Sequence, residues 1–203
     1  MTKQTKNIIF DFGNVLVEFN PHKLYDDVFN GDVAKAEWFH QNITTEPFYN
    51  RIDRGDNFEQ CISDLQKEHP EYAKEIALYD SRYHDMVGDA LPGMPVMLTN
   101  LKARGYHLYG LTNWSYKVYA VMERVPLFRL LDGSVVSSEE HIIKPDERIY
   151  QRIVSKFGLT PSECLFVDDR QINIDAALAC GMHAILFKNS EQLSFELKSI
   201  GIL

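Results

Sequence analysis

Short runs of apolar and branched residues, bounded by glycine or polar positions, mark the strands that we predict along this chain. The first run covers residues 8–10, and comparable runs follow within residues 105–113, 163–169 and 183–187. Apolar runs without alternation are typical of strands that are buried on both faces of a sheet. The pattern therefore predicts a sheet whose strands come from both ends of the chain.

Between the later runs, apolar positions recur with helical spacing in residues 116–125, 147–157 and 172–179. Gly158 and Gly181 stand where the C-terminal caps of two of these helices are expected, because glycine adopts the left-handed cap conformation without strain. Alternation of strands and helices is typical of parallel sheets. We therefore predict an α/β fold with a Rossmann-like, mostly parallel sheet flanked by helices.

The long interval of residues 17–91 has a different pattern. Charged and aromatic residues follow one another at helical spacing, and no convincing strand is visible. The turn signal Pro92-Gly93 closes the interval. We predict an all-helical lid, inserted after the first strand into a core made of residues 1–16 and 92–203. The alternative is an extra helical layer with no role in binding.

Composition narrows the class of protein. The chain has 203 residues, of which 45% are hydrophobic, and this suffices for one globular core with a sizeable insertion. The formal net charge of −8 argues against a broad basic face, so no nucleic-acid partner is expected. A small anionic substrate is compatible with this charge, because one metal ion or lysine can reverse the field locally.

The cysteines and the N-terminus favour a cytoplasmic protein. Cys61, Cys164 and Cys180 have neither metal-ligand spacing nor the spacing of a disulfide framework, which favours reduced thiols. The first residues are polar, and the apolar run after them is too short for a signal or membrane segment. We expect no membrane association, and the sequence leaves the oligomeric state open.

Chemically useful side chains follow three of the predicted strands. The first strand ends in Asp11, the second in Thr112-Asn113 and a later one in Asp168-Asp169. Ligands of parallel α/β sheets bind outside the carboxyl ends of the strands, where these residues are expected. Lys144, between the second and third of these strands, precedes a proline that favours an extended backbone.

Four segments carry a resemblance to a known family. In chain order they are "FDFGNVL", "LTNWS", "IIKPDERIY" and "FVDDRQINIDAA". Together they resemble the four motifs of the haloacid dehalogenase superfamily, in the subfamily I that carries a helical cap. The "DFGNV" segment is also similar to a branch that includes α-D-glucose-1-phosphate phosphatases. The resemblance implies a Mg²⁺-dependent phosphatase that acts on a small phosphorylated metabolite, with a sugar phosphate as the first candidate.

The same resemblance assigns expected roles to residues. Asp11 would attack phosphorus and form an aspartyl-phosphate, which splits the hydrolysis into two easier steps. Mg²⁺ would offset the charge of phosphate and carboxylates, and Lys144 would assist as a catalytic and phosphate-binding cation. The expected metal site comprises Asp11, the backbone carbonyl of Gly13, Asp168 and, directly or through water, Asp169, with Asn173 and Asp175 as possible supports. The expected phosphate-binding groups are Thr112, the Asn113 backbone and Lys144.

Four further residues are weaker candidates for contact with the substrate. Trp114 follows Asn113 directly, although an aromatic residue at a helix start is a core residue at least as often. Phe48, Arg51 and Arg54 lie in the predicted lid. An arginine there would suit a sugar hydroxyl or a second anion, while solvated surface is the competing interpretation.

Gly13 departs from the pattern of most phosphatases in this superfamily. They carry at this position a second aspartate, which protonates the leaving oxygen and later activates water. Such acid–base help is worth about 10²–10⁴ in rate. Three interpretations stay open: a phosphatase with another acid or with an acidic leaving group such as an anomeric hydroxyl, a metal-independent 2-haloacid dehalogenase, or a non-catalytic binder of phosphorylated ligands. The acidic pair at Asp168-Asp169 favours metal-dependent chemistry.

Overall fold

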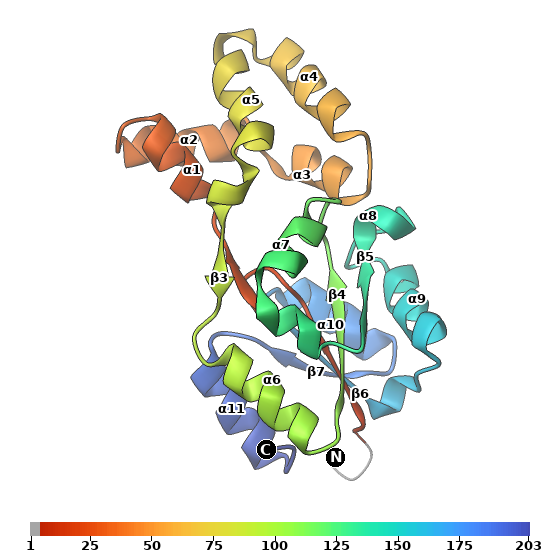
Figure 1. Cartoon of the computed structure of the whole chain (residues 1–203). Helices are drawn as coiled ribbons and strands as arrows, with labels where there is room; N and C mark the ends of the chain where they lie inside the picture. Colours follow the sequence, from red (N-terminus) through yellow and green to blue (C-terminus); the bar gives the residue numbers. More distant parts are fainter. Residues whose placement is uncertain (1–4) are drawn as a thin grey trace.

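A five-stranded parallel sheet forms the centre of the protein (Figure 1). The computed structural model describes residues 5–203. The strand order is β5-β4-β1-β6-β7, and every neighbouring pair in this sheet is parallel. The strands are β1 (Asn7–Phe10), β4 (His107–Thr112), β5 (Gly133–Val136), β6 (Cys164–Asp168) and β7 (His183–Leu186). The predicted α/β class with a mostly parallel sheet is confirmed.

Helices cover both faces of this sheet, as the alternation of side chains along β1 shows. Ile8 and Phe10 join one apolar cluster, and Ile9 between them joins the other. The first cluster includes residues of α6 (Met94–Ala103), α7 (Val118–Arg124), the 3₁₀ turn η3 (Pro126–Leu130) and α11 (Ser190–Ser199). The second includes residues of α9 (Glu147–Phe157) and α10 (Gln171–Ala179). Both faces of the strand are therefore buried, which explains its unbroken apolar sequence.

The predicted helices of the core are present with small shifts. The structure has α7 where residues 116–125 were expected, and α9 and α10 agree within one residue. Gly158 caps α9 with a φ of 64°. The strand β5 is missing from the sequence prediction. Its four residues, Gly-Ser-Val-Val, are too few and too mixed to give a strand pattern, and it sits at the edge of the sheet.

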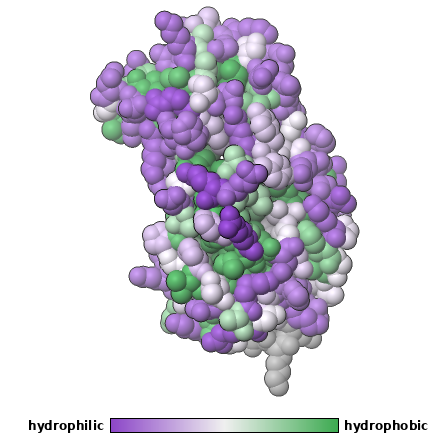
Figure 2. Space-filling view, viewed as in Figure 1, coloured by the Kyte–Doolittle hydropathy of each residue, from purple (hydrophilic) through white to green (hydrophobic). Residues whose placement is uncertain are grey.

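A helical insertion, defined here as residues 21–86, lies above the carboxyl edge of the sheet (Figure 1). Its helices are α1 (Pro21–Val28), α2 (Val33–Asn42), α3 (Glu46–Asp53), α4 (Phe58–Glu68) and α5 (Ala73–Ser81), with the 3₁₀ turns η1 (Pro70–Tyr72) and η2 (Tyr83–Met86). Figure 2 shows this part as an upper lobe whose exposed surface on the viewed face is mainly hydrophilic. The remaining short elements of the core are α8 (Ser137–Glu140) and η4 (Pro161–Glu163).

Two short strands join the helical insertion to the core. They are β2 (Val17–Phe19) and β3 (Val87–Ala90), which pair antiparallel. The prediction that the interval 17–91 contains no strand and is all-helical was therefore wrong at both ends. The strands have three and four residues, and β3 contains Gly88 and Asp89, so neither shows the apolar run of a buried strand. No helix within residues 5–203 is long and apolar enough to cross a membrane.

The backbone beyond β1 is held by an aromatic ring that rests on a glycine of β4. A Cβ atom at Gly110 would lie 2.2 Å from Cε1 of Phe12, so only glycine leaves room for this ring. On its other side the Phe12 ring packs edge-on against Phe128, with 4.7 Å between the ring centroids. Phe12 is fully buried and follows Asp11 directly. This packing fixes the position of the residue after Asp11.

We expect Gly110→Ala to destabilise the protein by about 1–3 kcal/mol, because the added methyl group overlaps the Phe12 ring. Urea unfolding followed by circular dichroism measures this loss. Combining the change with Phe12→Leu tests the cause, since a smaller side chain accommodates the methyl group. The double variant should lose less stability than the two single variants together, by about 1 kcal/mol. Simple additivity would show that the ring does not dictate glycine at this position.

Candidate active site

Three adjacent strands bring polar side chains together at one edge of the sheet. The central strand β1 lies between β4 and β6, and Asp11 is the residue that follows it. Thr112 is the last residue of β4, and Asp168 is the last residue of β6. The parallel pairing therefore places these three side chains at the same end of neighbouring strands, beneath the helical insertion.

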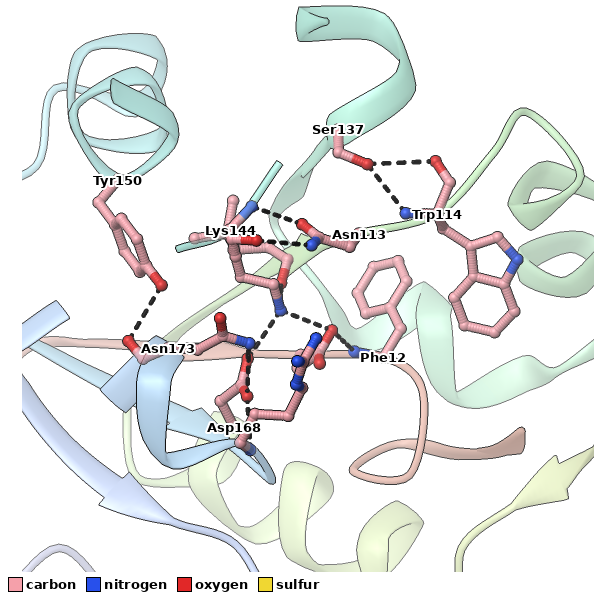
Figure 3. A network of polar contacts seen from close by, with 11 residues as sticks. Phe12, Asn113, Trp114, Ser137, Lys144, Tyr150, Asp168 and Asn173 are labelled. Atoms are coloured by element: carbon pink, nitrogen blue, oxygen red, sulfur yellow. Dashed lines mark hydrogen bonds and ion pairs between the residues drawn. The ribbon is translucent and has the colours of Figure 1, made fainter. Parts of the chain in front are cut away.

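Lys144 is at the centre of this cluster (Figure 3). Its Nζ lies 2.9 Å from Oδ1 of Asp11 and 2.7 Å from Oδ2 of Asp168, and it donates a third bond to the carbonyl of Leu111 at 3.0 Å. The side chain is fully buried. All three protons of the ammonium group therefore have acceptors, which is what permits a lysine to be buried in the charged state.

The side chain of Asn113 positions the loop that carries Lys144. Its Oδ1 accepts from the Lys144 backbone N–H at 2.7 Å, and its Nδ2 donates to the Lys144 carbonyl at 3.0 Å. This two-bond contact joins the end of β4 to the segment before α9 (Figure 3). Sequence reasoning assigned only the backbone of Asn113 to the site. The structure adds a role for its amide, which holds the lysine in register with the carboxylates.

The cluster carries more negative than positive charge. Asp11, Asp168 and Asp169 can bring one oxygen each to within 4.8 Å of one another. Burial raises the pKa of Asp11 to about 7 against the opposing charge of Lys144, with a further increase from Asp168. Burial also raises the pKa of Asp169, and the neighbouring Asp168 adds to this effect. Three carboxylates against one lysine leave an excess that a hard divalent cation with oxygen ligands would neutralise, so this donor set fits Mg²⁺.

Asp168 behaves differently because it has more partners. Burial opposes its ionisation, but the charge and hydrogen bond of Lys144 hold its pKa below the usual value. Asn173 donates from Nδ2 to Asp168 at 2.9 Å, and the Arg170 backbone N–H donates at 2.9 Å. Asn173 thus supports this carboxylate. Asp175 instead lies exposed on α10 and accepts from Gln171.

Two buried oxygens at the site have no partner among the described residues. They are Oγ1 of Thr112 and Oδ1 of Asn173, and both residues line the cavity described next. An unpaired buried polar atom costs free energy unless a ligand or water satisfies it. The threonine hydroxyl is therefore available to a bound molecule next to Asp11.

A cavity of about 480 Å³ separates the carboxylates from the helical insertion. Its core wall includes six of the predicted site residues: Asp11, Gly13, Thr112, Asn113, Lys144 and Asp169. Its insertion wall is made by His40, Gln41, Thr44, Thr45, Glu46, Tyr49, Asn50, Asp53, Tyr79 and Tyr83. The volume suits a small metabolite, and both walls offer polar groups for recognition.

Of the four weaker candidates for substrate contact, one lines the cavity and three lie outside it. Trp114 lines the cavity and is otherwise buried against Phe19, with 5.3 Å between the ring centroids. Phe48, Arg51 and Arg54 do not appear among the described residues that line it. The structure places them outside this cavity.

Helix geometry explains why these three residues lie outside the cavity. Phe48 is buried in the insertion core against Tyr79, Arg51 pairs on the surface with Asp56 and Asp64, and Arg54 is exposed. The residues of α3 that face the cavity are Glu46, Tyr49, Asn50 and Asp53. Their spacing of i, i+3, i+4 and i+7 is one face of a helix, and this spacing was the available signal in the sequence.

Asp53 connects the insertion wall to the core. The Ser137 hydroxyl donates to the Asp53 carbonyl at 2.5 Å and accepts from the Trp114 backbone N–H at 2.9 Å. Burial raises the pKa of the Asp53 carboxyl to about 7, and the charge of Asp11 adds to this shift. Lys144 and the backbone of Ser115 oppose it. Because its pKa responds to Asp11, the Asp53 carboxyl is electrostatically coupled to the cluster at the strand ends.

Comparison of the sequence with known families accounts for this arrangement. Residues 5–181 match the haloacid dehalogenase-like hydrolase family over most of the chain. The protein belongs to this family. The resemblance found in its four motifs is confirmed at the level of the superfamily.

Relatives with assigned activities include phosphatases. The flavin mononucleotide hydrolase 1 of Arabidopsis thaliana is 30% identical over 112 residues, which cover 55% of this chain and 46% of that protein. The chain thus spans less than half of this relative, and it spans 19% of another, the mouse acyl-CoA dehydrogenase family member 10. The D-ribitol-5-phosphate phosphatase of Bacteroides thetaiotaomicron is 25% identical over 211 residues, covering 96% of this chain and 98% of that protein.

Solved structures share the fold. A haloacid dehalogenase family enzyme from Bacteroides thetaiotaomicron, in complex with magnesium and inorganic phosphate, superposes with a TM-score of 0.75 at 19% identity, covering 95% of this chain and 98% of that one. A dehalogenase with an intermediate complex gives a TM-score of 0.69 at 21% identity, covering 93% and 87%. Because a family enzyme that holds magnesium and phosphate and a dehalogenase both match, the fold alone does not decide which chemistry this protein carries out.

We predict that Lys144→Met lowers the free energy of unfolding by about 3–5 kcal/mol, because it leaves Asp11 and Asp168 buried without their counter-charge. Urea unfolding in EDTA measures the loss. Addition of Mg²⁺ should recover part of it, whereas Na⁺ at equal ionic strength should not.

Lys102→Met is the matched control for this prediction. Lys102 pairs with Asp132 at 2.7 Å, but both side chains are 33% exposed, so its loss should cost about 1 kcal/mol or less. Equal losses for the two lysines would contradict the view that Lys144 holds the cluster together.

Proposed function

We propose that this protein is a Mg²⁺-dependent phosphatase that acts on a small phosphorylated metabolite through an aspartyl-phosphate on Asp11. The observation that carries the proposal is the cluster of three carboxylates beside the buried Lys144, two of them buried and two of them lining the cavity. This cluster combines a nucleophile with donors for a hard cation. The relatives that hydrolyse phosphate esters, and a structural neighbour that holds magnesium and phosphate, support it.

Asp11 is suited to act as the nucleophile because its orientation is fixed. Its Oδ1 accepts from the Phe12 backbone N–H at 2.7 Å and from Lys144 at 2.9 Å. Both contacts use the same oxygen, so the plane of the carboxylate is held while Oδ2 is left for other chemistry. Phe12 is itself fixed by its packing on Gly110. A rigid carboxylate is the requirement for attack along one line on a bound phosphorus.

Thr112, Asn113 and Lys144 supply the groups that bind the phosphoryl oxygens. The Thr112 hydroxyl has no partner among the described residues and lies at the end of the strand next to Asp11. The Asn113 backbone follows it into the same cavity, and Lys144 contributes a positive charge. Such fixed donors stabilise the charge that spreads over the phosphoryl oxygens in the transition state.

Asp11, the Gly13 carbonyl, Asp168 and Asp169 are the groups that would hold Mg²⁺, which would offset the negative charge of the phosphoryl group and orient it. Gly13 and Asp169 line the cavity beside Asp11, which is compatible with this set. Asn173 supports the set indirectly, because it donates to Asp168 and restricts the rotation of that carboxylate.

The acidic pair also bears on the two alternatives. A metal-independent dehalogenase has no use for three neighbouring carboxylates, whose mutual repulsion adds to the effect of burial in raising the pKa values of Asp11 and Asp169. A non-catalytic binder of phosphate esters would bind its ligand more tightly without these carboxylates, since they repel the negative charge of the phosphate. Retention of the whole cluster therefore favours metal-dependent hydrolysis over both.

A sugar or polyol monophosphate is the substrate class that the cavity wall suits best. The insertion contributes hydroxyl and amide groups from Gln41, Thr44, Thr45, Tyr49 and Asn50, which can hydrogen-bond to substrate hydroxyls. Its carboxylates, Glu46 and Asp53, disfavour a second phosphate or a carboxylate on that side.

We expect the purified protein to release inorganic phosphate from members of a panel of sugar and polyol phosphates when Mg²⁺ is present, and to stop when EDTA removes it. Asp11→Asn should lower kcat by at least about 10³-fold, since it removes the nucleophile. Asp175→Asn is the matched control, because this aspartate is exposed and outside the cavity. It should retain full activity.

Two results would overturn the proposal. Dehalogenation of 2-chloropropionate in EDTA, without phosphate release, would assign the protein to the dehalogenases. Tight binding of phosphate esters without turnover, by calorimetry, would make it a binder.

A further inference from the structure

The phosphatase chemistry proposed above needs a proton donor that the backbone beside Asp11 does not supply. Gly13 has no side chain, and the space next to it is bordered by Phe19 and Trp114, which lie 3.5 and 3.6 Å from a Cβ placed there. Among the described residues that line the cavity, the carboxylates are Asp11 and Asp169 on the core side and Glu46 and Asp53 on the insertion side. Asp11 and Asp169 belong to the nucleophile and cation cluster, so a carboxylate donor from the lining of this cavity has to come from α3.

Glu46 and Asp53 stand at opposite ends of α3 and have different surroundings. Glu46 is exposed and pairs with Arg170 of the core at 3.5 Å. Asp53 is partly buried and lines the same cavity as Asp11 and Lys144. Glu46 is exposed and already paired with a cation, so of the two acids on the insertion wall Asp53 is the better candidate for a proton donor.

Contacts with the core hold Asp53 in this place. The Ser137 hydroxyl donates a hydrogen bond to the backbone carbonyl of Asp53 and accepts one from the backbone N–H of Trp114, two positions beyond Thr112. The next residues, Arg54 and Gly55, also touch the core. The Nδ1–H of His141 donates to the Arg54 carbonyl at 3.0 Å, and a Cβ at Gly55 would lie 2.3 Å from the Ser138 carbonyl oxygen. The C-terminal end of α3 and the two residues after it are thus held against the core by these contacts.

From this placement we infer that Asp53 is the general acid and base of the reaction, in the role that Gly13 cannot fill. The inference rests on the proposed phosphatase function and adds a catalytic residue to it. It corresponds to the first interpretation that the sequence left open, namely a phosphatase whose acid comes from elsewhere in the chain.

With Asp53 in this role, every proton transfer in the two steps of hydrolysis has a donor and an acceptor. As a carboxylate oxygen of Asp11 forms a bond to phosphorus, the bond from phosphorus to the leaving oxygen breaks, and its electron pair stays on that oxygen. The proton of Asp53 moves to the leaving oxygen, so the alcohol departs neutral. Asp53, now ionised, takes a proton from the water that attacks the aspartyl-phosphate. Inorganic phosphate is released, Asp11 is regenerated, and Asp53 is protonated again.

The ionisation of Asp53 agrees with this role. A pKa of about 7 leaves roughly half of the molecules protonated at neutral pH, whereas an ordinary aspartate would be protonated in about one molecule in a thousand. The groups that face it are Asp11 and Lys144 from the core and the phenols of Tyr49, Tyr79 and Tyr83 from the insertion. The charge on Asp11 and burial favour the protonated form.

The test compares two phosphate esters that differ in their need for a proton donor. The leaving group of D-ribitol 5-phosphate is a strongly basic alkoxide, while p-nitrophenyl phosphate releases a stable phenolate. With Mg²⁺ present, Asp53→Asn should lower kcat/KM by about 10²-fold or more for the ribitol ester, and by less than about 10-fold for the nitrophenyl ester. The retained activity on the nitrophenyl ester shows at the same time that the variant is folded.

Glu46→Gln is the matched control, since it removes the other acid of the same helix. Any loss it causes should be equal for both esters. A second variant adds an acid beside the nucleophile: the contacts of a Cβ at position 13 are of ordinary van der Waals length, so Gly13→Asp can be accommodated. In that background the Asp53→Asn change should cost less than about 10-fold on the ribitol ester.

An equal loss on both esters, or no rescue by Gly13→Asp, would assign Asp53 to substrate binding or to structure and would overturn the inference while the phosphatase function stands. Wild-type activity on the nitrophenyl ester alone, with none on alkyl or sugar phosphates, would also overturn it, because no general acid would then be operating. A wild-type protein that hydrolyses neither ester would overturn the proposed function itself.

Discussion

The buried ammonium group of Lys144 is the contact on which the site depends. It joins the acid after β1 to the acid that ends β6 and bonds the carbonyl of Leu111 in β4, so three strands converge on one charge. Without it, two carboxylates would be buried side by side with no compensation. Asn113 fixes the backbone of the lysine by two hydrogen bonds and thereby ties the loop before α9 to the end of β4. The same lysine therefore determines both the charge balance of the site and the alignment of the three strand ends.

The core half of this arrangement could be predicted because each part has a local signature. The strands β1, β4 and β6 are apolar runs that end in polar residues, and the rule that ligands gather at the carboxyl ends of parallel strands brings those residues together. The unpaired hydroxyl of Thr112 and the burial of Lys144 are consequences of that convergence. The edge strand β5 left no such signature, since it is short and contains glycine and serine.

Residue type did not predict which residues of the insertion face the cavity, because that depends on how α3 is rotated about its axis. Phe48, Arg51 and Arg54 are conspicuous residue types, yet rotation sends Phe48 into the insertion core and the arginines to the surface. Tyr49, Asn50 and Asp53 take the face toward the cavity. That rotation is set by tertiary contacts such as the bond from Ser137 to Asp53, between residues far apart in the sequence. Residue type alone carries no information about it.

Ser137 has a wider consequence. Its hydroxyl group bonds both the backbone of Trp114, in the loop after β4, and the backbone of Asp53, at the end of α3. A shift of either segment therefore disturbs the contact of the other. In the proposed mechanism the proton donor is on the insertion and the nucleophile is on the core, so neither part holds a complete set of reactive groups by itself. That mechanism therefore requires the docked arrangement. Under this proposal, a ligand too large to let the insertion dock on the core would not be hydrolysed, even if its phosphate reached Asp11.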